Sequence, residues 1–101
     1  MRGWVIAVAT ALQESNLVDI RGGDRDSLGL FQQRPSQGWG KVSELMDPAT
    51  SARLFYNRLV KVSGWETKSV GAAAQAVQRS AFPDAYAKHQ AQAEKIVGAL
   101  F

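Results

Sequence analysis

Apolar residues recur at helical spacing in several stretches of this 101-residue chain, whereas no stretch alternates between apolar and polar residues as a strand would. The clearest stretch has apolar residues at i, i+3, i+4 and i+7, namely Ala52, Phe55, Tyr56 and Leu59. Asp47 has the residue type of a helix cap, and Pro48 that of a first helical position. We therefore expect a helix from this cap to about Val62, with the four spaced residues in the core.

Three further stretches predict helices with the same spacing. The N-terminal stretch places Trp4, Val5, Val8, Leu12 and Ser15 on one stripe, and Ala7, Thr10 and Glu14 on another face. A later stretch repeats Val70, Ala73, Ala74 and Val77, and the last repeats Tyr86, Ala93, Val97 and Leu100. These sets are the expected core faces of three more helices.

The rest of the chain predicts turns and a loop. Residues 19–27 are rich in Gly and Asp and indicate turns, and residues 29–40 predict an ordered loop with at most a short strand. With 46% hydrophobic and 21% charged residues, the composition is that of a globular domain, and the length suffices for one core. We predict a single mostly-α domain over residues 1–101, with about four main helices and little or no sheet.

Composition excludes several kinds of chemistry. The chain has no cysteine, so it has no disulfide, no thiol nucleophile and no Cys-ligated metal. Its one histidine, His89, is expected to be exposed on the last helix and makes a His-rich metal site or a Ser-His-Asp triad unexpected. We expect no cofactor and no metal. The net charge of +3 suits an anionic polymer, whether cell wall or nucleic acid, without choosing between them.

The first residues allow two interpretations. Met1 and Arg2 precede ten uncharged residues, a run too short to span a bilayer but similar to a short signal peptide that could end at residues 9–11. The helical stripe favours an amphipathic helix of the folded domain instead. On that interpretation the chain carries no export signal, and is an excised domain or is released by another route.

Glu14 is the first candidate for chemistry. It is predicted near the end of a helix, off the main stripe, and just before a polar, glycine-rich loop. Most such carboxylates are solvated surface groups. A carboxyl group that borders apolar helix surface beneath a loop can instead stay protonated and serve as a general acid.

The surrounding residues resemble those of a known family. The segments at residues 13–15 (Gln-Glu-Ser) and 27–32 (Ser-Leu-Gly-Leu-Phe-Gln), followed by a helix with Ala52, Phe55 and Tyr56, are similar to lysozyme-like lytic transglycosylases, which are related to goose-type lysozymes. The similarity runs from about residue 4 to residue 86. Each motif is weak alone, and the specificity lies in their order and spacing.

The resemblance implies an enzyme that cleaves the β-1,4 bond between N-acetylmuramic acid and N-acetylglucosamine in peptidoglycan. It implies that Glu14 is the catalytic acid and that Ser15, Gly29, Phe31 and Gln32 line the substrate site. Gly29 would let the backbone pass close to the saccharide. For Ser15, a local helix-end hydrogen bond is an equal alternative.

Two parts of the pattern depart from the family. Asp24, in Gly-Asp-Arg, resembles an aspartate of goose-type lysozymes that helps to place the attacking water, but its interval from Glu14 is shorter and ordinary turn chemistry explains it slightly better. A Tyr-Asn-Ala-Gly segment of many transglycosylases is replaced by Val77, Gln78, Arg79 and Ser80. Gln78 could replace the asparagine as an amide donor to the substrate N-acetyl group. Tyr86 could supply the missing hydroxyl, although its spacing favours the core.

The mechanism that fits has Glu14 donate its proton to the glycosidic oxygen and then act as a base. Activation of the C6 hydroxyl of the sugar gives a 1,6-anhydro product, whereas activation of a water held by Asp24 gives hydrolysis. With one securely matched carboxylate, we favour the transglycosylase outcome. The alternatives are a goose-type-like muramidase and a catalytically inactive peptidoglycan-binding module.

Aromatic and basic residues complete the candidates. Trp39, between two glycines, could stack on a sugar or pack into the core, while Trp4 and Trp65 are expected to pack. Arg34 and Arg79 could face acidic groups of the polymer. A nucleic-acid binder is not favoured because the basic residues are spread along the chain. We expect a monomeric protein whose partner is the peptidoglycan glycan strand and which does not insert stably into a membrane. We expect it outside the cell, in the wall or periplasm, or delivered by a phage.

Overall fold

The computed structural model describes residues 2–17, 26–79 and 84–100, and within these ranges the chain is mostly helical. In chain order the elements are α1 (Arg2–Ser15), the 3-10 helix η1 (Pro35–Gln37), α2 (Val42–Leu45), α3 (Pro48–Leu59), α4 (Val70–Gln78), the 3-10 helix η2 (Ala87–His89) and α5 (Gln90–Leu100). The described residues contain no β-strand beyond an isolated antiparallel bridge between Leu28 and Gln33. The prediction of a mostly-α fold is confirmed.

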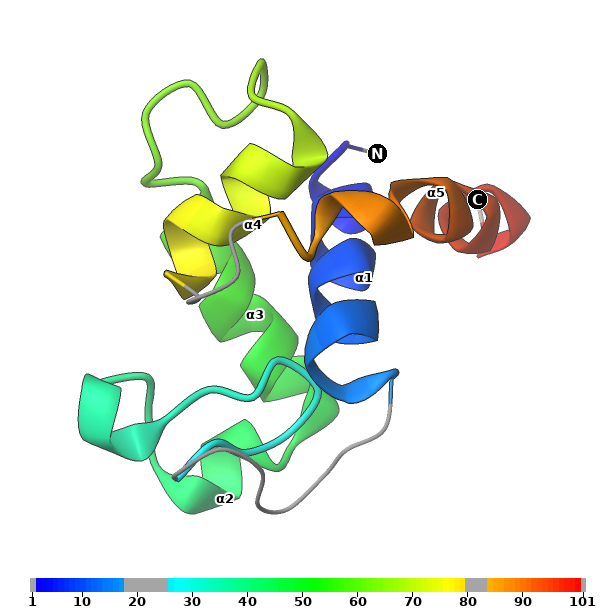
Figure 1. The fold of residues 1–101 in the computed structure, drawn as a ribbon. Coiled ribbons are helices and arrows are strands. Elements are labelled where there is room, and N and C mark those ends of the chain that lie inside the picture. The colour runs from blue at the N-terminus through cyan, green and yellow to red at the C-terminus, as the bar shows by residue number, and fades with distance from the viewer. Residues whose placement is uncertain (1, 18–25, 80–83, 101) are drawn as a thin grey trace.

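Helix α1 is the centre of the arrangement (Figure 1). It packs against α3, α4 and α5 and against η2, and α3 and α4 pack against each other. The loop of residues 26–40 and α2 lie at the end of the fold where α1 finishes (Figure 1). The C-terminal end of α1 is therefore the place where the loop, α4 and the segment before α5 can meet.

Caps define α3 and α4 as the sequence suggests. Asp47 accepts a hydrogen bond from the backbone N–H of Thr50 at 3.2 Å, and Pro48 occupies the first turn of α3. Ser69 caps α4 by accepting from the N–H of Ala72 at 3.1 Å. The predicted core face of α4 is confirmed, because Val70, Ala73, Ala74 and Val77 are all buried.

Other core predictions are confirmed only in part. Phe55, Leu59, Tyr86, Ala93 and Val97 are buried as predicted. The prediction was wrong for Trp4, Tyr56 and Leu100, which are 55%, 45% and 70% exposed. Leu100 lies in the last turn of α5, so fewer neighbours are there to cover it.

The buried face of α1 differs from the predicted stripe. Ile6, Ala9 and Thr10 are completely buried, and Thr10 satisfies its hydroxyl by donating to the Ile6 carbonyl at 2.7 Å. Near the start of the helix Gly3, rather than Trp4, faces the neighbouring aromatic residues. A Cβ at Gly3 would lie 2.9 Å from Tyr56 Cε2 and 3.6 Å from Trp65. The aromatic side chains thus pack against the small residue Gly3, and the next residue, Trp4, lies outside the core.

Candidate functional site

Glu14 lies in the last turn of α1 and is half-buried. The helix ends at Ser15, because Asn16 and Leu17 adopt positive φ angles of 55° and 64° that do not continue an α-helix. Two side chains from distant parts of the chain donate hydrogen bonds to its Oε2 atom. Among the described residues no hydrogen bond reaches Oε1.

The first donor is Gln78, the last residue of α4. Its Nε2 lies 2.8 Å from Glu14 Oε2 and 2.8 Å from the Phe31 carbonyl oxygen. Both partners are acceptors, so the nitrogen and not the oxygen of the amide must face them. Gln78 thus joins the carboxyl group to the loop. Its own Oε1 is buried and has no hydrogen-bond partner within the described part of the chain.

This geometry changes the role predicted for Gln78. As a donor to a substrate N-acetyl group it would need a free N–H, but both N–H groups of its amide are engaged. The remaining polar atom, Oε1, is an acceptor and is buried. In this conformation Gln78 therefore holds Glu14 against the loop.

The second donor is Tyr86, whose hydroxyl lies 2.8 Å from Glu14 Oε2. The ring is 1% exposed and belongs to the main core cluster, so the expectation of a core position is confirmed. The hydroxyl nevertheless reaches the carboxyl group. The residue type alone could have indicated such a contact, because the hydroxyl of a buried tyrosine usually has a hydrogen-bond partner, whereas a phenylalanine needs none.

The loop before η1 closes on the end of α1. Leu28 and Gln33 exchange backbone hydrogen bonds of 2.9 and 3.0 Å, which makes residues 28–33 a tight turn. Gly29 has φ 78° there, a conformation that glycine adopts without steric cost. Gln32, with φ 49°, turns its side-chain amide to the Gly29 carbonyl at 3.0 Å.

Ser15 fastens this loop to α1. Its hydroxyl lies 2.6 Å from the Leu30 carbonyl and 3.1 Å from the Ala11 carbonyl, and the residue is 5% exposed. The hydrogen bond to Ala11, four residues earlier, is the local helix-end bond that was the alternative prediction for Ser15. Its burial and partners make it a positioning residue for the loop in this conformation, not a group that faces a substrate.

Phe31 has a buried side chain in the same loop. Its ring stacks on Phe55 with centroids 4.7 Å apart and an interplanar angle of 17°. The ring is 3% exposed, so the part of Phe31 that belongs to the Glu14 cluster is its carbonyl oxygen. Gln33 ties the same loop to α3 by donating from Nε2 to the Ser51 carbonyl at 3.1 Å.

Asp24 lies outside the described residues, so its place relative to Glu14 stays a prediction. The structure places the other predicted residues as follows. Glu14 and Gln78 touch directly, Gly29, Phe31 and Gln32 lie in the adjoining loop, and Ser15 of α1 donates to that loop. Trp39 lies in the next part of that loop, beyond η1.

Trp39 is half-buried and packs against the core cluster. One face of its ring is covered by Arg58, whose Cζ lies 3.6 Å from the ring centroid. Arg58 also donates from Nη2 to the Gly38 carbonyl at 3.0 Å. Burial lowers the pKa of Arg58, and the nearby positive charge of Arg79 lowers it further. A sugar could stack only on the face of Trp39 that Arg58 leaves uncovered.

Arg34, the other arginine considered for acidic ligands, is already paired. Its Nε lies 2.6 Å from Asp26 Oδ1, and Asp26 Oδ2 accepts from the Ser36 N–H at 2.9 Å. These hydrogen bonds, first of all the one from Arg34, hold the pKa of Asp26 well below its usual value. Asp26 therefore organises the loop around η1.

His89 is half-buried rather than exposed, which corrects the prediction. Its Nε2 lies 2.9 Å from Oε1 of Gln13, the residue before Glu14. Burial lowers the pKa of His89, and the charge of Lys88 adds to that effect. Gln13 and Glu14 thus hold η2 and the residue before it against the end of α1.

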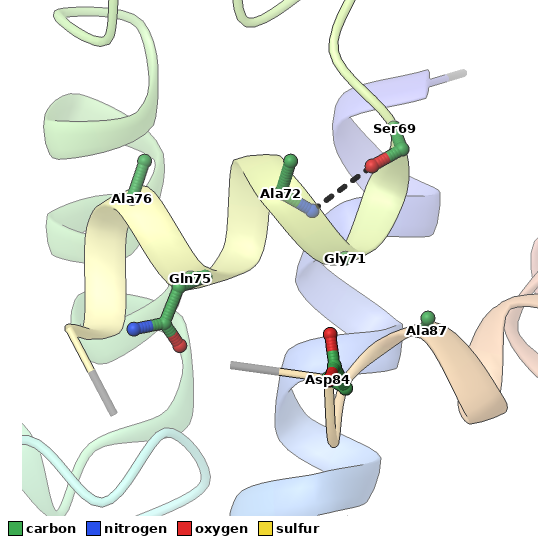
Figure 2. A pocket seen from close by; sticks show the side chains of 7 residues that line it. All are labelled: Ser69, Gly71, Ala72, Gln75, Ala76, Asp84 and Ala87. Atoms are coloured by element: carbon green, nitrogen blue, oxygen red, sulfur yellow. Dashed lines mark hydrogen bonds between the residues drawn. The ribbon is translucent and has the colours of Figure 1, made fainter. Parts of the chain in front are cut away.

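A groove of about 480 Å³ lies between α4 and the segment before α5. It is lined by Ser69, Gly71, Ala72, Gln75, Ala76, Asp84 and Ala87. Figure 2 shows Gln75 and Asp84 projecting into the same space below α4. None of the predicted site residues lines this groove, although it shares α4 and the segment around Tyr86 with the Glu14 cluster.

Comparison of the chain with protein-family models and with curated proteins finds no match. Within the described residues no three His, Cys, Asp or Glu side chains gather as a metal site would require. No helix in the same part of the chain is long and apolar enough to cross a membrane.

Chemically, the Glu14 cluster is a carboxyl group with one fixed oxygen and one open oxygen. The two donors on Oε2 set the plane of the group. A proton on the carboxyl would lie on Oε1, because Oε2 already accepts two hydrogen bonds. Such a group is suited to delivering and taking back a proton at one position.

Proposed function

We propose that this chain cleaves the β-1,4 glycosidic bond between N-acetylmuramic acid and N-acetylglucosamine in peptidoglycan, with Glu14 as general acid and then general base. The observation that carries the proposal is the pair of 2.8 Å hydrogen bonds from Gln78 and Tyr86 to a single oxygen of Glu14. The similarity of residues 13–15 and 27–32 to lysozyme-like lytic transglycosylases supplies the substrate.

In the first step Glu14 gives the proton on Oε1 to the glycosidic oxygen as positive charge develops on the sugar ring. Gln78 and Tyr86 stabilise the carboxylate that this transfer leaves behind, since each donates to a charged acceptor. The 2-acetamido group of the substrate assists from within the sugar, so no protein nucleophile is needed.

In the second step the Glu14 carboxylate removes a proton from the C6 hydroxyl of the sugar, and a 1,6-anhydro end forms. This outcome needs a single carboxylate. Hydrolysis by a goose-type-like mechanism needs in addition a group that holds water, the role predicted for Asp24. A peptidoglycan-binding module without turnover would keep the cluster and release nothing.

The test is incubation of the protein with purified peptidoglycan, followed by mass spectrometry of the released muropeptides. Anhydro ends are expected, reducing ends would indicate a muramidase, and no release would contradict the proposal. Glu14→Gln should abolish release and keep the fold, because the glutamine carbonyl can still accept from Gln78 and Tyr86. Glu66→Gln, the same change at an exposed position, should retain activity.

A further inference from the structure

Arg58 and Arg79 lie at the C-terminal ends of two helices that pack against each other, and the positive charge of Arg79 acts on Arg58. Arg58 lies in the last turn of α3, and Arg79 caps the C-terminal end of α4 directly after Gln78. The two helices pack against each other, and Figures 1 and 2 both place the C-terminal end of α4 beside α3. Arg79 follows in sequence the residue that holds the Glu14 carboxyl group.

The Arg58 guanidinium is held in one orientation. It stacks on Trp39 at 3.6 Å, and one N–H is fixed to the Gly38 carbonyl at 3.0 Å. A guanidinium has five N–H donors in a planar fork, and this arrangement uses one of them. The stacked platform therefore presents an oriented fork whose remaining donors are available to an anion.

Neither arginine has an acidic partner in the described part of the chain. The ion pair found there joins Arg34 to Asp26, at the loop around η1. Arg79 is exposed and adopts φ 52°, a left-handed conformation in which asparagine or glycine is the more usual residue. Two cations placed near each other without a carboxylate repel, and a bound anion would remove that repulsion.

Helix dipoles explain only part of this arrangement. A cation at a helix C-terminus interacts favourably with the helix dipole, which accounts for one arginine at each helix end. The stacking of Arg58 on Trp39 is favourable in its own right and fixes the plane of the guanidinium. Neither effect supplies a counter-ion for the two positive charges, whereas a ligand carboxylate would.

We propose that Arg58 and Arg79, with Trp39 as a platform, form a carboxylate-binding subsite next to Glu14 that takes the acidic side groups of the glycan strand. This inference rests on the proposed function, which supplies the polymer. In that polymer the lactyl group of N-acetylmuramic acid ends in a carboxylate or in a peptide that bears carboxylates. The bidentate geometry of arginine matches a carboxylate.

The experiment measures binding in the Glu14→Gln background, so that strands are not cleaved during titration. Three ligands are compared: glycan strands with intact stem peptides, strands stripped by an amidase so that only the lactyl carboxylate remains, and an uncharged chito-oligosaccharide. Arg58→Gln/Arg79→Gln is compared with Arg53→Gln/Lys61→Gln, which removes the same charge from two exposed positions.

We expect the double arginine variant to raise the Kd for intact strands about tenfold and the control pair to change it less than twofold. The Kd for the uncharged chito-oligosaccharide should be the same in the double arginine variant and in the control pair. If the difference persists on stripped strands, the lactyl carboxylate is the ligand, and if it disappears there, the stem peptide is. Arg79→Gln alone, at an exposed position, should show part of the effect if the variant at Arg58 is unstable.

Equal loss in the control pair, or equal loss on the uncharged oligosaccharide, would overturn the subsite. So would arginine-dependent binding of duplex DNA in preference to the strands, with the steep salt dependence of phosphate contacts. Failure of the proposed function looks different. In that case the chain with Glu14 intact releases no muropeptide, whereas arginine-dependent binding of acidic strands persists.

Discussion

Removal of the Tyr86 hydroxyl tests whether the second donor to Glu14 acts on the reaction. Tyr86→Phe deletes the 2.8 Å hydrogen bond to Oε2 and leaves the buried ring in place. A hydrogen bond to a charged group contributes about 1.5–3 kcal/mol. Since Glu14 is half-buried, water can replace part of the lost bond, and we take the lower limit of about 1.5 kcal/mol.

This free energy corresponds to a loss of about tenfold in kcat, because about 1.4 kcal/mol changes a rate tenfold. KM should stay within about twofold, since the carboxylate that the hydroxyl stabilises forms only as the bond breaks. The assay is the initial rate of muropeptide release as a function of peptidoglycan concentration. Tyr56→Phe, the same change on a tyrosine that is 45% exposed, is the matched control.

A double variant tests whether the two donors to Glu14 Oε2 act on the reaction together. Gln78→Met removes the other donor to the same oxygen, and contacts that share one partner are not additive. The loss in Tyr86→Phe/Gln78→Met should therefore differ from the sum of the single losses by at least about 0.5 kcal/mol. An unchanged kcat in Tyr86→Phe, or a fall matched by Tyr56→Phe, would refute the role assigned to the hydroxyl.

Three further predictions concern stability. The pKa of Asp26 is depressed in the folded protein, so its hydrogen bonds to Arg34 and Ser36 stabilise the fold at pH values above the ordinary carboxyl pKa. Asp26→Asn should therefore have a lower Tm than the unmodified chain at pH 7, and this difference should shrink as the pH falls below about 4. The pKa of His89 is also depressed, chiefly by burial, so stability should fall as the pH drops below about 6.5, and urea titrations should show a weaker fall in His89→Gln. Gly29→Ala should lower the free energy of unfolding by about 1 kcal/mol because φ is 78°; an unchanged urea midpoint would contradict this.

The helices α3 and α4 could be predicted from the sequence because each combines a cap with regular apolar spacing. The helix α2 was not predicted, since its four residues are too few for a period to be recognised. The face of α1 was misjudged because that helix packs on several sides and uses small residues, such as Ala9, where the spacing favoured large ones. Helical periodicity detects a single buried stripe and not a helix surrounded by others.

For the candidate site, the sequence indicated Glu14 and the loop but not the contacts between segments. Gln78 was predicted to face a substrate, and the contacts of its amide with Glu14 and Phe31 had no signal in the sequence. Arg58 was not singled out, since its stacking on Trp39 depends on how α3 lies against the loop. Local patterns predict which residues are chemically suited to a role, whereas packing decides which of them meet.

The hydrogen bond between Glu14 and Tyr86 joins residues 72 positions apart in a chain of 101. During translation the carboxyl group is synthesised 64 residues before Gln78 and 72 residues before Tyr86. Until Gln78 and Tyr86 have left the ribosome, the group has neither donor. Prematurely terminated products that stop before Gln78 would therefore keep the glutamate and lack the means to orient it.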